Sequence, residues 1–83
     1  MNVELTPKAE KYFRQMNQPD KGRIVKALEK LCAGPPQGDI RPLVSRDSYR
    51  LRVGSYRILF KVKEHSIAVH AITPRGQAYK GGF

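Results

Sequence analysis

The first half of the chain carries apolar side chains at helical spacing. Thr6 and Pro7 supply an N-cap side chain and a proline suited to the first helical position, so a helix is expected to begin there. Apolar residues then recur at the i, i+3, i+4, i+7 spacing of a single buried stripe, twice in succession. The first stripe is Ala9, Tyr12, Phe13 and Met16, and the second is Ile24, Ala27, Leu28 and Leu31. The pattern predicts a helical hairpin, with a break after Asn17 and an end at Gly34.

From residue 40 onward the apolar period falls from that of a helix to the alternation of a strand. Apolar and basic residues alternate through 49–53, and the alternation continues through 56–62 with Leu59 among the basic positions. Gly54-Ser55 between the two runs suits a two-residue hairpin turn. A third run, 67–72, is rich in β-branched residues, and Pro74 is expected to end it. We predict an antiparallel three-stranded meander and an α+β fold, with the helical hairpin packed on one face of the sheet.

A two-residue turn fixes the register of the strands on either side of it. The expected pairs are Val53 with Tyr56, Arg52 with Arg57, Leu51 with Ile58, and Arg50 with Leu59. One face of the sheet then collects the apolar side chains and can receive the helices. The opposite face, which we call the basic face, carries Arg50, Arg52, Arg57 and Lys61.

The same register can be extended across the second turn of the meander. It pairs Val62 with Ile67 and Leu59 with His70. The side chains of Ile67, Val69 and Ala71 are then expected on the apolar face, and those of Ala68, His70 and Ile72 on the basic face. We expect His70 to fill space against Leu59, and a functional role for His70 is the alternative.

The net charge of the chain indicates what kind of partner it binds. The 83 residues fit one domain spanning residues 1–83, and their 16 Lys+Arg against 7 Asp+Glu give a net charge of +9. Residues 1–39 hold seven basic and five acidic side chains, whereas residues 40–83 hold nine and two. Such an excess is typical of a chain that meets a polyanion or an acidic protein. The binding surface is therefore expected in the second half.

Several classes of site and location are disfavoured by the composition. A single cysteine, Cys32, excludes an intramolecular disulfide and a Cys-based metal site. The acidic residues are scattered and none is predicted on the basic face, so neither metal-assisted chemistry nor a cofactor is expected. No apolar run approaches the ~18 residues of a membrane span, and no secretory pattern opens the chain. We expect a cytosolic protein that has no membrane partner.

The cluster of cations on the basic face favours anion binding over the alternative, a plain face whose charges are hydrated and screened by salt. Arg52 opposite Arg57 destabilises a cross-strand pair by up to ~1 kcal/mol, and no acidic residue is expected among the alternating positions. Arginine suits phosphate because its planar fork holds two oxygens at once. Arg75 and Tyr79 follow the last strand, close to this face, where positive charge would favour the phenolate and make Tyr79 a possible general base. Without metal, this chemistry requires RNA, whose own 2′-hydroxyl can attack the phosphate.

The sequence resembles a known superfamily in two stretches. These are Tyr49-Arg50-Leu51-Arg52-Val53-Gly54-Ser55-Tyr56-Arg57-Ile58-Leu59-Phe60-Lys61-Val62 and Ile72-Thr73-Pro74-Arg75-Gly76-Gln77-Ala78-Tyr79. The pattern resembles the RelE/ParE superfamily of bacterial type II toxins, over essentially the whole chain. The resemblance implies a small mixed sheet in which an N-terminal strand, within residues 2–5, joins the meander.

The resemblance also implies roles for individual residues. Arg50 and Arg52 match two cationic residues of the nuclease motif, and Arg57 matches the arginine that contacts the scissile phosphate. Arg75 matches an arginine that stabilises transition-state charge, and Tyr79 matches the general base. The expected catalytic residues are Arg52, Arg57, Arg75 and Tyr79, and the expected RNA-binding residues are Arg46, Arg50, Lys61 and Lys80.

Relatives similar to RelE cleave mRNA in the ribosomal A site without metal, leaving a 2′,3′-cyclic phosphate and a 5′-hydroxyl. The resemblance therefore implies an mRNA endoribonuclease, with the ribosome and mRNA as partners and an acidic, RelB-like antitoxin covering the basic face. Two alternatives stay open. One is an inhibitor of DNA gyrase similar to ParE, and the other is a degenerate toxin that binds acidic partners without chemistry.

Overall fold

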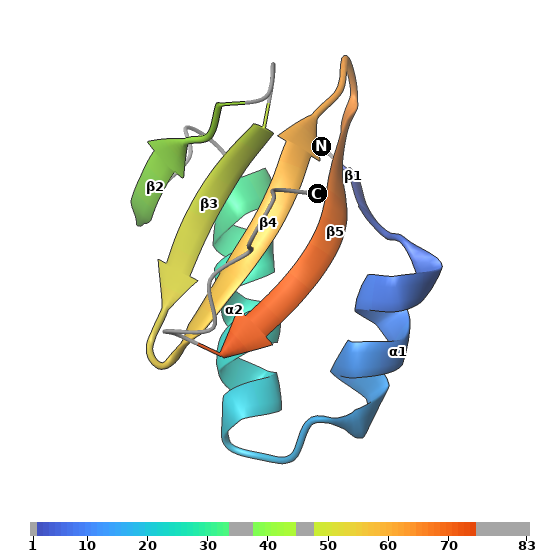
Figure 1. The fold of residues 1–83 in the computed structure, drawn as a ribbon, viewed down its shortest axis with the longest axis vertical. Helices are drawn as coiled ribbons and strands as arrows, with labels where there is room; N and C mark the ends of the chain where they lie inside the picture. The colour runs from blue at the N-terminus through green and yellow to red at the C-terminus, as the bar shows by residue number, and fades with distance from the viewer. Residues whose placement is uncertain (1, 34–37, 45–47, 75–83) are drawn as a thin grey trace.

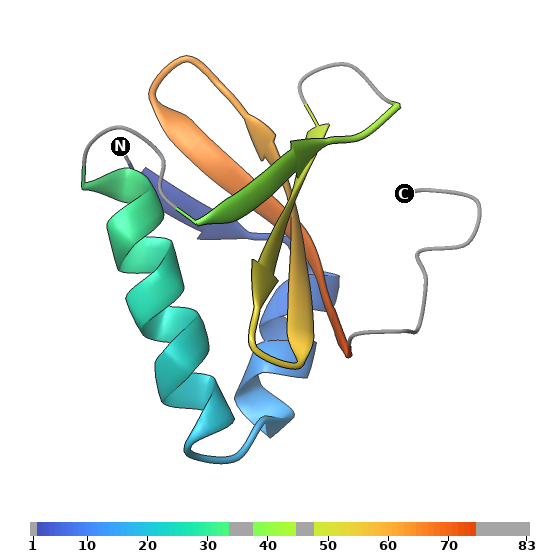
Figure 2. The ribbon, with the colours of Figure 1, turned by 90° about the vertical axis from the view of Figure 1, so that its left-hand side faces the viewer.

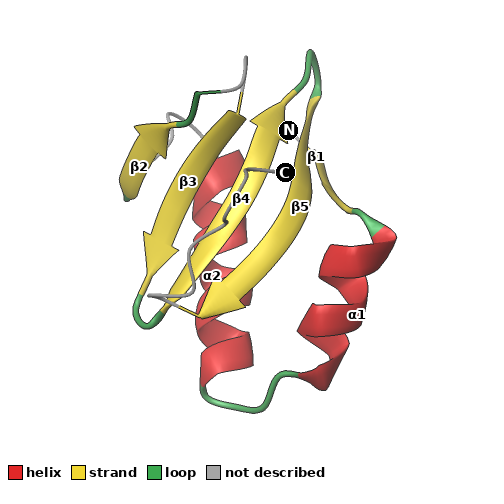
Figure 3. Cartoon of the chain, in the orientation of Figure 1, coloured by secondary structure: helices red, strands yellow, loops and turns green. Residues whose placement is uncertain are grey.

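The computed structural model describes residues 2–33, 38–44 and 48–74. These residues form one mixed sheet and two helices (Figures 1 and 3). In chain order the elements are β1 (Asn2–Leu5), α1 (Pro7–Gln15), α2 (Asp20–Cys32), β2 (Asp39–Pro42), β3 (Ser48–Val53), β4 (Tyr56–Val62) and β5 (Ser66–Pro74). The strand order is β1-β5-β4-β3-β2, with β1 parallel to β5 and the other neighbours antiparallel. The predicted α+β fold and the predicted N-terminal strand are confirmed.

Both helices lie on the same face of the sheet, as the side view in Figure 2 shows. Their predicted stripes supply the helical half of the core: Ala9 and Ile24 have no exposed surface, and Leu31 is 1% exposed. Ile58 and Val69 meet them from the sheet, and both are fully buried. Burial of these side chains between two layers is the main stabilising contribution in a chain of this size. Within the described residues, neither helix is long and apolar enough to cross a membrane.

Helix α1 begins where the sequence predicts. Thr6 is the N-cap, its Oγ1 accepts a hydrogen bond from the backbone N–H of Ala9 at 3.3 Å, and Pro7 occupies the first turn. The same hydroxyl donates to the carbonyl oxygen of His70, also at 3.3 Å, and the Thr6 N–H donates to the carbonyl oxygen of Val69 at 2.9 Å. One residue therefore caps the helix and fixes its start to β5.

The β3–β4 hairpin has the predicted register in full. Its inner pair is Val53 with Tyr56, followed by Arg52 with Arg57, Leu51 with Ile58 and Arg50 with Leu59. Gly54 has a φ of +55°, the left-handed backbone conformation that a tight two-residue turn requires and that glycine adopts without strain.

The predicted register between β4 and β5 is confirmed at one end of the two strands and wrong at the other. Val62 pairs with Ile67 as expected, but an irregularity between Leu59 and Phe60 pairs Leu59 with Ala71 instead of His70. A bulge inserts one unpaired residue, so the strand beyond it changes face. Ile72 consequently joins the buried core cluster, and Ala71 takes the position opposite Leu59 on the other face. The sequence analysis had placed these two residues the other way round.

Strand β2 was missed in the sequence analysis. It spans four residues with a single strongly apolar side chain, Ile40, and ends in a proline, so the alternation is too short to distinguish it from a loop. Gly38 leads into it with a φ of +117°, where a side chain would be strained and would come within 2.9 Å of Leu51. The meander therefore has a fourth strand beyond β3, antiparallel to it.

Candidate functional site

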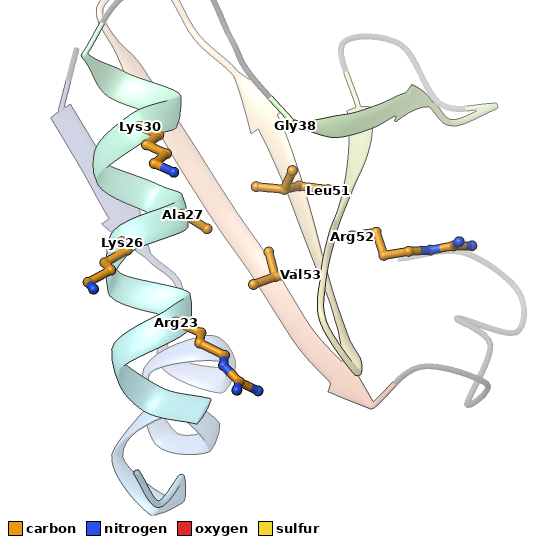
Figure 4. Close-up of a pocket in the computed structure, with 8 residues that line it drawn as sticks. All are labelled: Arg23, Lys26, Ala27, Lys30, Gly38, Leu51, Arg52 and Val53. Carbon is orange, nitrogen blue, oxygen red and sulfur yellow. The ribbon is translucent and has the colours of Figure 1, made fainter. Parts of the chain in front are cut away.

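The two faces of β3 separate sharply by chemistry. Figure 4 shows Leu51 and Val53 pointing toward α2, whereas Arg52 between them points to the opposite side of the sheet. The alternation that buries the apolar residues therefore presents the arginines on the face away from the helices. The hairpin register brings together Arg50, Arg52, Arg57 and Lys61, as the sequence predicted.

Strand β2 adds a fifth cation to this face. Arg41 pairs with Arg50 across the β2–β3 ladder, on the same side of the sheet. Arg52 lies directly opposite Arg57 in the β3–β4 ladder, so the like-charge pair predicted from the turn is present. The sequence feature that could have placed Arg41 on this face is the polar-apolar-polar alternation Asp39-Ile40-Arg41, which is too short to predict a strand.

The prediction that no acid lies on the basic face is wrong. Asp39 pairs with Arg52 across the ladder, and its carboxylate reaches three guanidiniums. Oδ1 lies 3.4 Å from Nη2 of Arg50 and 3.8 Å from Nε of Arg41, and Oδ2 lies 3.7 Å from Nε of Arg52. Counted over these described residues alone, the five cations and Asp39 carry a formal charge of 5 − 1 = +4. This acid was missed because strand β2 was missed.

A second acid lies at the far edge of the same sheet face. Glu4 on β1 pairs with Ala68, which itself pairs with Lys61, and its Oε1 lies 3.8 Å from Nζ of Lys63. Both partners of this ion pair are more than half exposed, so solvent screens the interaction. Strand β5 lies between Glu4 and the strands β4 and β3, which carry Arg57, Arg52 and Arg50. Glu4 therefore lies at the edge of the sheet, away from the arginines at its centre.

Part of the basic face is buried. Arg50 is 5% exposed, and Ser48 and Leu59 are each 1% exposed. Nη1 of Arg50 is buried and has no hydrogen-bond acceptor in the part of the chain that the structure describes. A buried charged donor without an acceptor is costly, so this nitrogen is a suitable place for an incoming anion. Arg52, by contrast, keeps about a third of its side chain exposed.

His70 is the residue at the bulge and lies close to lysine side chains. Burial lowers the pKa of His70 below its ordinary value, and the positive charges of Lys61 and Lys63 lower it further. The imidazole is therefore neutral at pH 7 and able to accept a proton. This environment differs from the predicted packing against Leu59, because the bulge removes the pairing of these two residues.

Tyr56 lies on the other side of the sheet and is not suited to act as a base. Burial raises the pKa of Tyr56, and the nearby carboxylate of Asp20 and the Tyr12 side chain raise it further. Its phenol therefore stays protonated at neutral pH. It lines a cavity of about 290 Å³ with Tyr12 and Asp20, on the side of the helices.

A second basic surface lies between α2 and β3. A cleft of about 380 Å³ has Ala27, Leu51 and Val53 along its apolar walls, and the cations of α2 stand at its rim (Figure 4). These rim cations are Arg23, Lys26 and Lys30. Basic side chains at the rim of an apolar cleft make this surface electrostatically suited to an acidic partner.

Four of the predicted site residues lie outside the described residues. They are Arg46, Arg75, Tyr79 and Lys80. The roles expected for them stay predictions. Among the described residues, no group of three or more His, Cys, Asp and Glu side chains could hold a metal ion.

Comparison with known proteins gives the family. Residues 3–79 match the family model described as the ParE toxin of the type II toxin-antitoxin system parDE. The chain belongs to the ParE toxin family. It is therefore a type II toxin of the RelE/ParE superfamily, as the resemblance of its hairpin implied. A comparison with curated protein sequences found no match.

Solved structures agree with this toxin fold. The isolated RelE toxin of E. coli superposes with a TM-score of 0.79 at 15% identity, over 93% of this chain and 86% of that one. RelE in the RelB–RelE antitoxin–toxin complex of Methanococcus jannaschii gives 0.78 at 21% identity, over 98% and 100%. The YoeB dimer of Staphylococcus aureus gives 0.71 at 21%, over 88% and 94%. At these identities the likeness establishes the fold.

Proposed function

We propose that this toxin is a ribosome-dependent, metal-independent endoribonuclease that cleaves mRNA and so inhibits translation. The observation that carries the proposal is the pairing of Arg52 with Arg57 on a face that also holds Arg50 and Lys61. Such a concentration of fixed positive charge fits a phosphodiester whose negative charge grows during reaction. The proposed place of action is the cytoplasm, where ribosomes and mRNA meet.

The chemistry assigned to this face uses the RNA's own nucleophile. The 2′-oxygen forms a bond to phosphorus while the bond from phosphorus to the 5′-oxygen breaks, giving a 2′,3′-cyclic phosphate and a 5′-hydroxyl. A base takes the proton of the 2′-hydroxyl, and an acid supplies a proton to the leaving oxygen. Guanidiniums stabilise the charge on the phosphorane without changing their own protonation, because arginine stays charged near neutral pH.

The proposed residue roles follow from the resemblance to RelE-like toxins and from the charge of the side chains. Arg57 and Arg52 are proposed to hold the non-bridging oxygens of the scissile phosphate, with Arg75 adding charge and Tyr79 acting as base. Arg50, Lys61, Arg46 and Lys80 are proposed to hold flanking phosphates. The buried Nη1 of Arg50 supports an anion close to this side chain.

The proposal is tested with purified toxin, programmed ribosomes and mRNA in the presence of EDTA, by mapping the 5′ ends of the products. The wild-type protein is expected to cut within the ribosomal A site, and Arg57→Ala is expected to lower the single-turnover rate at least about 100-fold. Arg14→Ala is the matched control, because Arg14 lies on α1, is 74% exposed and pairs with Glu10. Uncut mRNA with the folded wild-type protein would overturn the proposal.

A second candidate function is inhibition of DNA gyrase, which the match to the ParE family model favours. This reading makes the toxin a binding protein, so the arginine face would have no chemical step to perform. Gyrase-cleaved DNA should then accumulate with the wild-type toxin and equally with the double variant Arg57→Ala/Tyr79→Phe. Intact ribosome-bound mRNA together with cleaved DNA would select this function over the endoribonuclease.

The proposed partner is an acidic, RelB-like antitoxin. Solved relatives in complex with RelB antitoxins support such a partner, and so does the net charge of +9. The cleft between α2 and β3 suits an acidic segment with apolar residues on one side, because it joins an apolar wall to Arg23 and Lys30. Co-purification with the acidic product of a neighbouring gene is expected to be weakened by Lys30→Glu and unchanged by Lys8→Glu on α1.

A further inference from the structure

Asp39 lies among the arginines of the basic face in the part of the chain that the structure describes, and phosphate binding does not account for it. We propose that Asp39 is a positioning residue, which orients the guanidiniums of Arg50 and Arg52 for the phosphate. This inference rests on the proposed endoribonuclease function. An acid among phosphate-binding arginines repels the substrate, so its place there calls for a second effect that outweighs the repulsion.

The carboxylate of Asp39 contacts two side chains that are two residues apart on β3. Oδ1 lies 3.4 Å from Nη2 of Arg50, and Oδ2 lies 3.7 Å from Nε of Arg52. Each carboxylate oxygen therefore serves a different guanidinium, and Arg41 completes the cluster at 3.8 Å. The side chains of residues 50 and 52 leave the same face of one strand, so a single carboxylate between them limits the movement of both.

The backbone holds the carboxylate in place. Asp39 is the first residue of β2 and pairs with Arg52 in the ladder, while Arg41 pairs with Arg50. Ile40, between them, packs against the core on the helix side. Gly38, directly before Asp39, has a φ of +117°, and a Cβ at this position would come within 2.9 Å of Leu51, so the backbone that leads into β2 suits glycine. The acid is thus carried by a paired strand, which holds a side chain more rigidly than a loop does.

The atoms that Asp39 engages leave the useful donors of Arg52 available. Its contact with Arg52 is an ion pair at 3.7 Å to Nε, the nitrogen nearest the stem of the side chain, and this buried nitrogen has no hydrogen-bond partner in the part of the chain that the structure describes. The two terminal nitrogens of a guanidinium held in this way are the pair that can grip a phosphate through two oxygens. The carboxylate also offsets the repulsion between Arg52 and Arg57, which face each other across the β3–β4 ladder.

Positioning and simple electrostatics predict opposite results when the charge of Asp39 is removed. Asp39→Asn raises the positive charge of the face, so electrostatic attraction alone would tighten RNA binding and leave or raise the cleavage rate. If the carboxylate positions the arginines, the single-turnover rate falls roughly 10- to 100-fold although binding is no weaker. Glu64→Gln is the matched control: it makes the same change in charge at a side chain that is 89% exposed and contacts His65 at 4.0 Å.

The experiment compares wild type, Asp39→Asn, Asp39→Glu and Glu64→Gln for rate and affinity on programmed ribosomes. We expect a lower rate without weaker binding for Asp39→Asn, partial rescue by Asp39→Glu, and a wild-type rate for Glu64→Gln. A rate for folded Asp39→Asn equal to that of Glu64→Gln would overturn the inference.

A second measurement does not depend on RNA cleavage. Guanidinium NMR of the wild-type protein should show Arg50 and Arg52 more restricted in motion than the exposed Arg14, with Asp39→Asn releasing Arg52. If the wild-type protein fails to cut mRNA, the proposed function fails, and these spectra still decide the positioning role. Unrestricted Arg52 in the wild type would overturn it, even if Asp39→Asn did not fold.

Discussion

The two faces of the sheet are built from the same strands and have opposite tasks. On the helix side, Leu51 and Ile58 are buried in the core, at 3% and 0% exposure. Their chain neighbours Arg52 and Arg57 turn to the basic face and form a like-charge pair. The alternation of a strand therefore lets every second residue enter the core while the others form the face that we propose for binding.

The comparison of the two faces predicts which property a substitution should change. A change on the helix side alters packing between two layers and lowers the free energy of unfolding, whereas a change on the basic face alters charge and leaves the layers intact. Substitutions at neighbouring positions of one strand should thus have separable effects. The predictions below are ordered from the largest expected effect to the smallest.

Truncation on the helix side should break the fold while leaving the charges in place. Ile58→Ala removes a side chain with no exposed surface from the centre of β4. We expect the free energy of unfolding to fall by about 3 kcal/mol, because a cavity remains between the layers. Urea denaturation followed by circular dichroism measures this. Arg14→Ala on the exposed side of α1 should change the value by less than about 0.5 kcal/mol, and an equal loss in both variants would contradict the layer assignment.

Salt should weaken binding to the basic face in proportion to the cations that touch phosphate. If Arg41, Arg50, Arg52, Arg57 and Lys61 each contact one, log K for a single-stranded RNA oligonucleotide should fall with log salt at a slope of about 3.5. This corresponds to roughly 100-fold weaker binding from about 50 to about 200 mM salt, measured by fluorescence anisotropy.

A pair of double variants sharpens the salt test. Arg52→Ala/Arg57→Ala should lower the slope by about 1.4, since two phosphate contacts are lost. Lys8→Ala/Lys26→Ala removes the same charge from the helices and should leave the slope unchanged. Equal slopes in the two double variants would mean that RNA binds by net charge rather than on this face.

Removal of the Thr6 hydroxyl should weaken the attachment of the start of α1 to β5. Thr6→Ala loses the N-cap bond to Ala9 and the bond to the carbonyl oxygen of His70. The expected loss is about 1 kcal/mol of unfolding free energy, as is typical of an N-cap. Thr6→Ser keeps the hydroxyl and should stay close to wild type in urea denaturation. A serine variant as unstable as the alanine variant would assign the effect to the methyl group.

The pH dependence of stability should report on His70, where the bulge lies. Because burial and the adjacent lysines lower its pKa, the unfolded chain takes up a proton at higher pH than the folded protein does. The contribution of neutral His70 is fully present above the ordinary pKa near 6.5 and is lost as pH falls below it. Urea midpoints should therefore drop between about pH 7 and about pH 5.5. His70→Asn should flatten this drop, and His65→Asn at an exposed turn should not.

The sequence was most informative where a turn and an alternating pattern coincide. Gly54-Ser55 allowed the register of the hairpin to be predicted pair by pair, and with it the facing of Arg52 and Arg57. The helical stripes were equally clear, since Ala9, Ile24 and Leu31 are all buried. In both cases several residues in succession follow one period, so local spacing is enough to decide the structure.

Prediction failed where the sheet departs from regular pairing. The bulge beside His70 exchanged the faces of Ala71 and Ile72, and no residue type marks such an insertion when all its neighbours are apolar. Strand β2 is too short to show a period, so the ion pairs of Asp39 with Arg50 and Arg52 were missed with it. These contacts form only when β2 pairs with β3, and the spacing of residues within one segment does not show which segments pair.

The parallel pairing of β1 with β5 has a consequence for synthesis. Residues 2–5 find their partner only in residues 66–69, so the first strand to be made waits for the last of the described strands. Ile67, Val69 and Ile72 of β5 also complete the core beneath the helices. A growing chain that lacks β5 therefore has no closed core, and its folding depends on contacts between its most distant segments. The sheet that carries the arginine face is thus complete only after β5 has been translated.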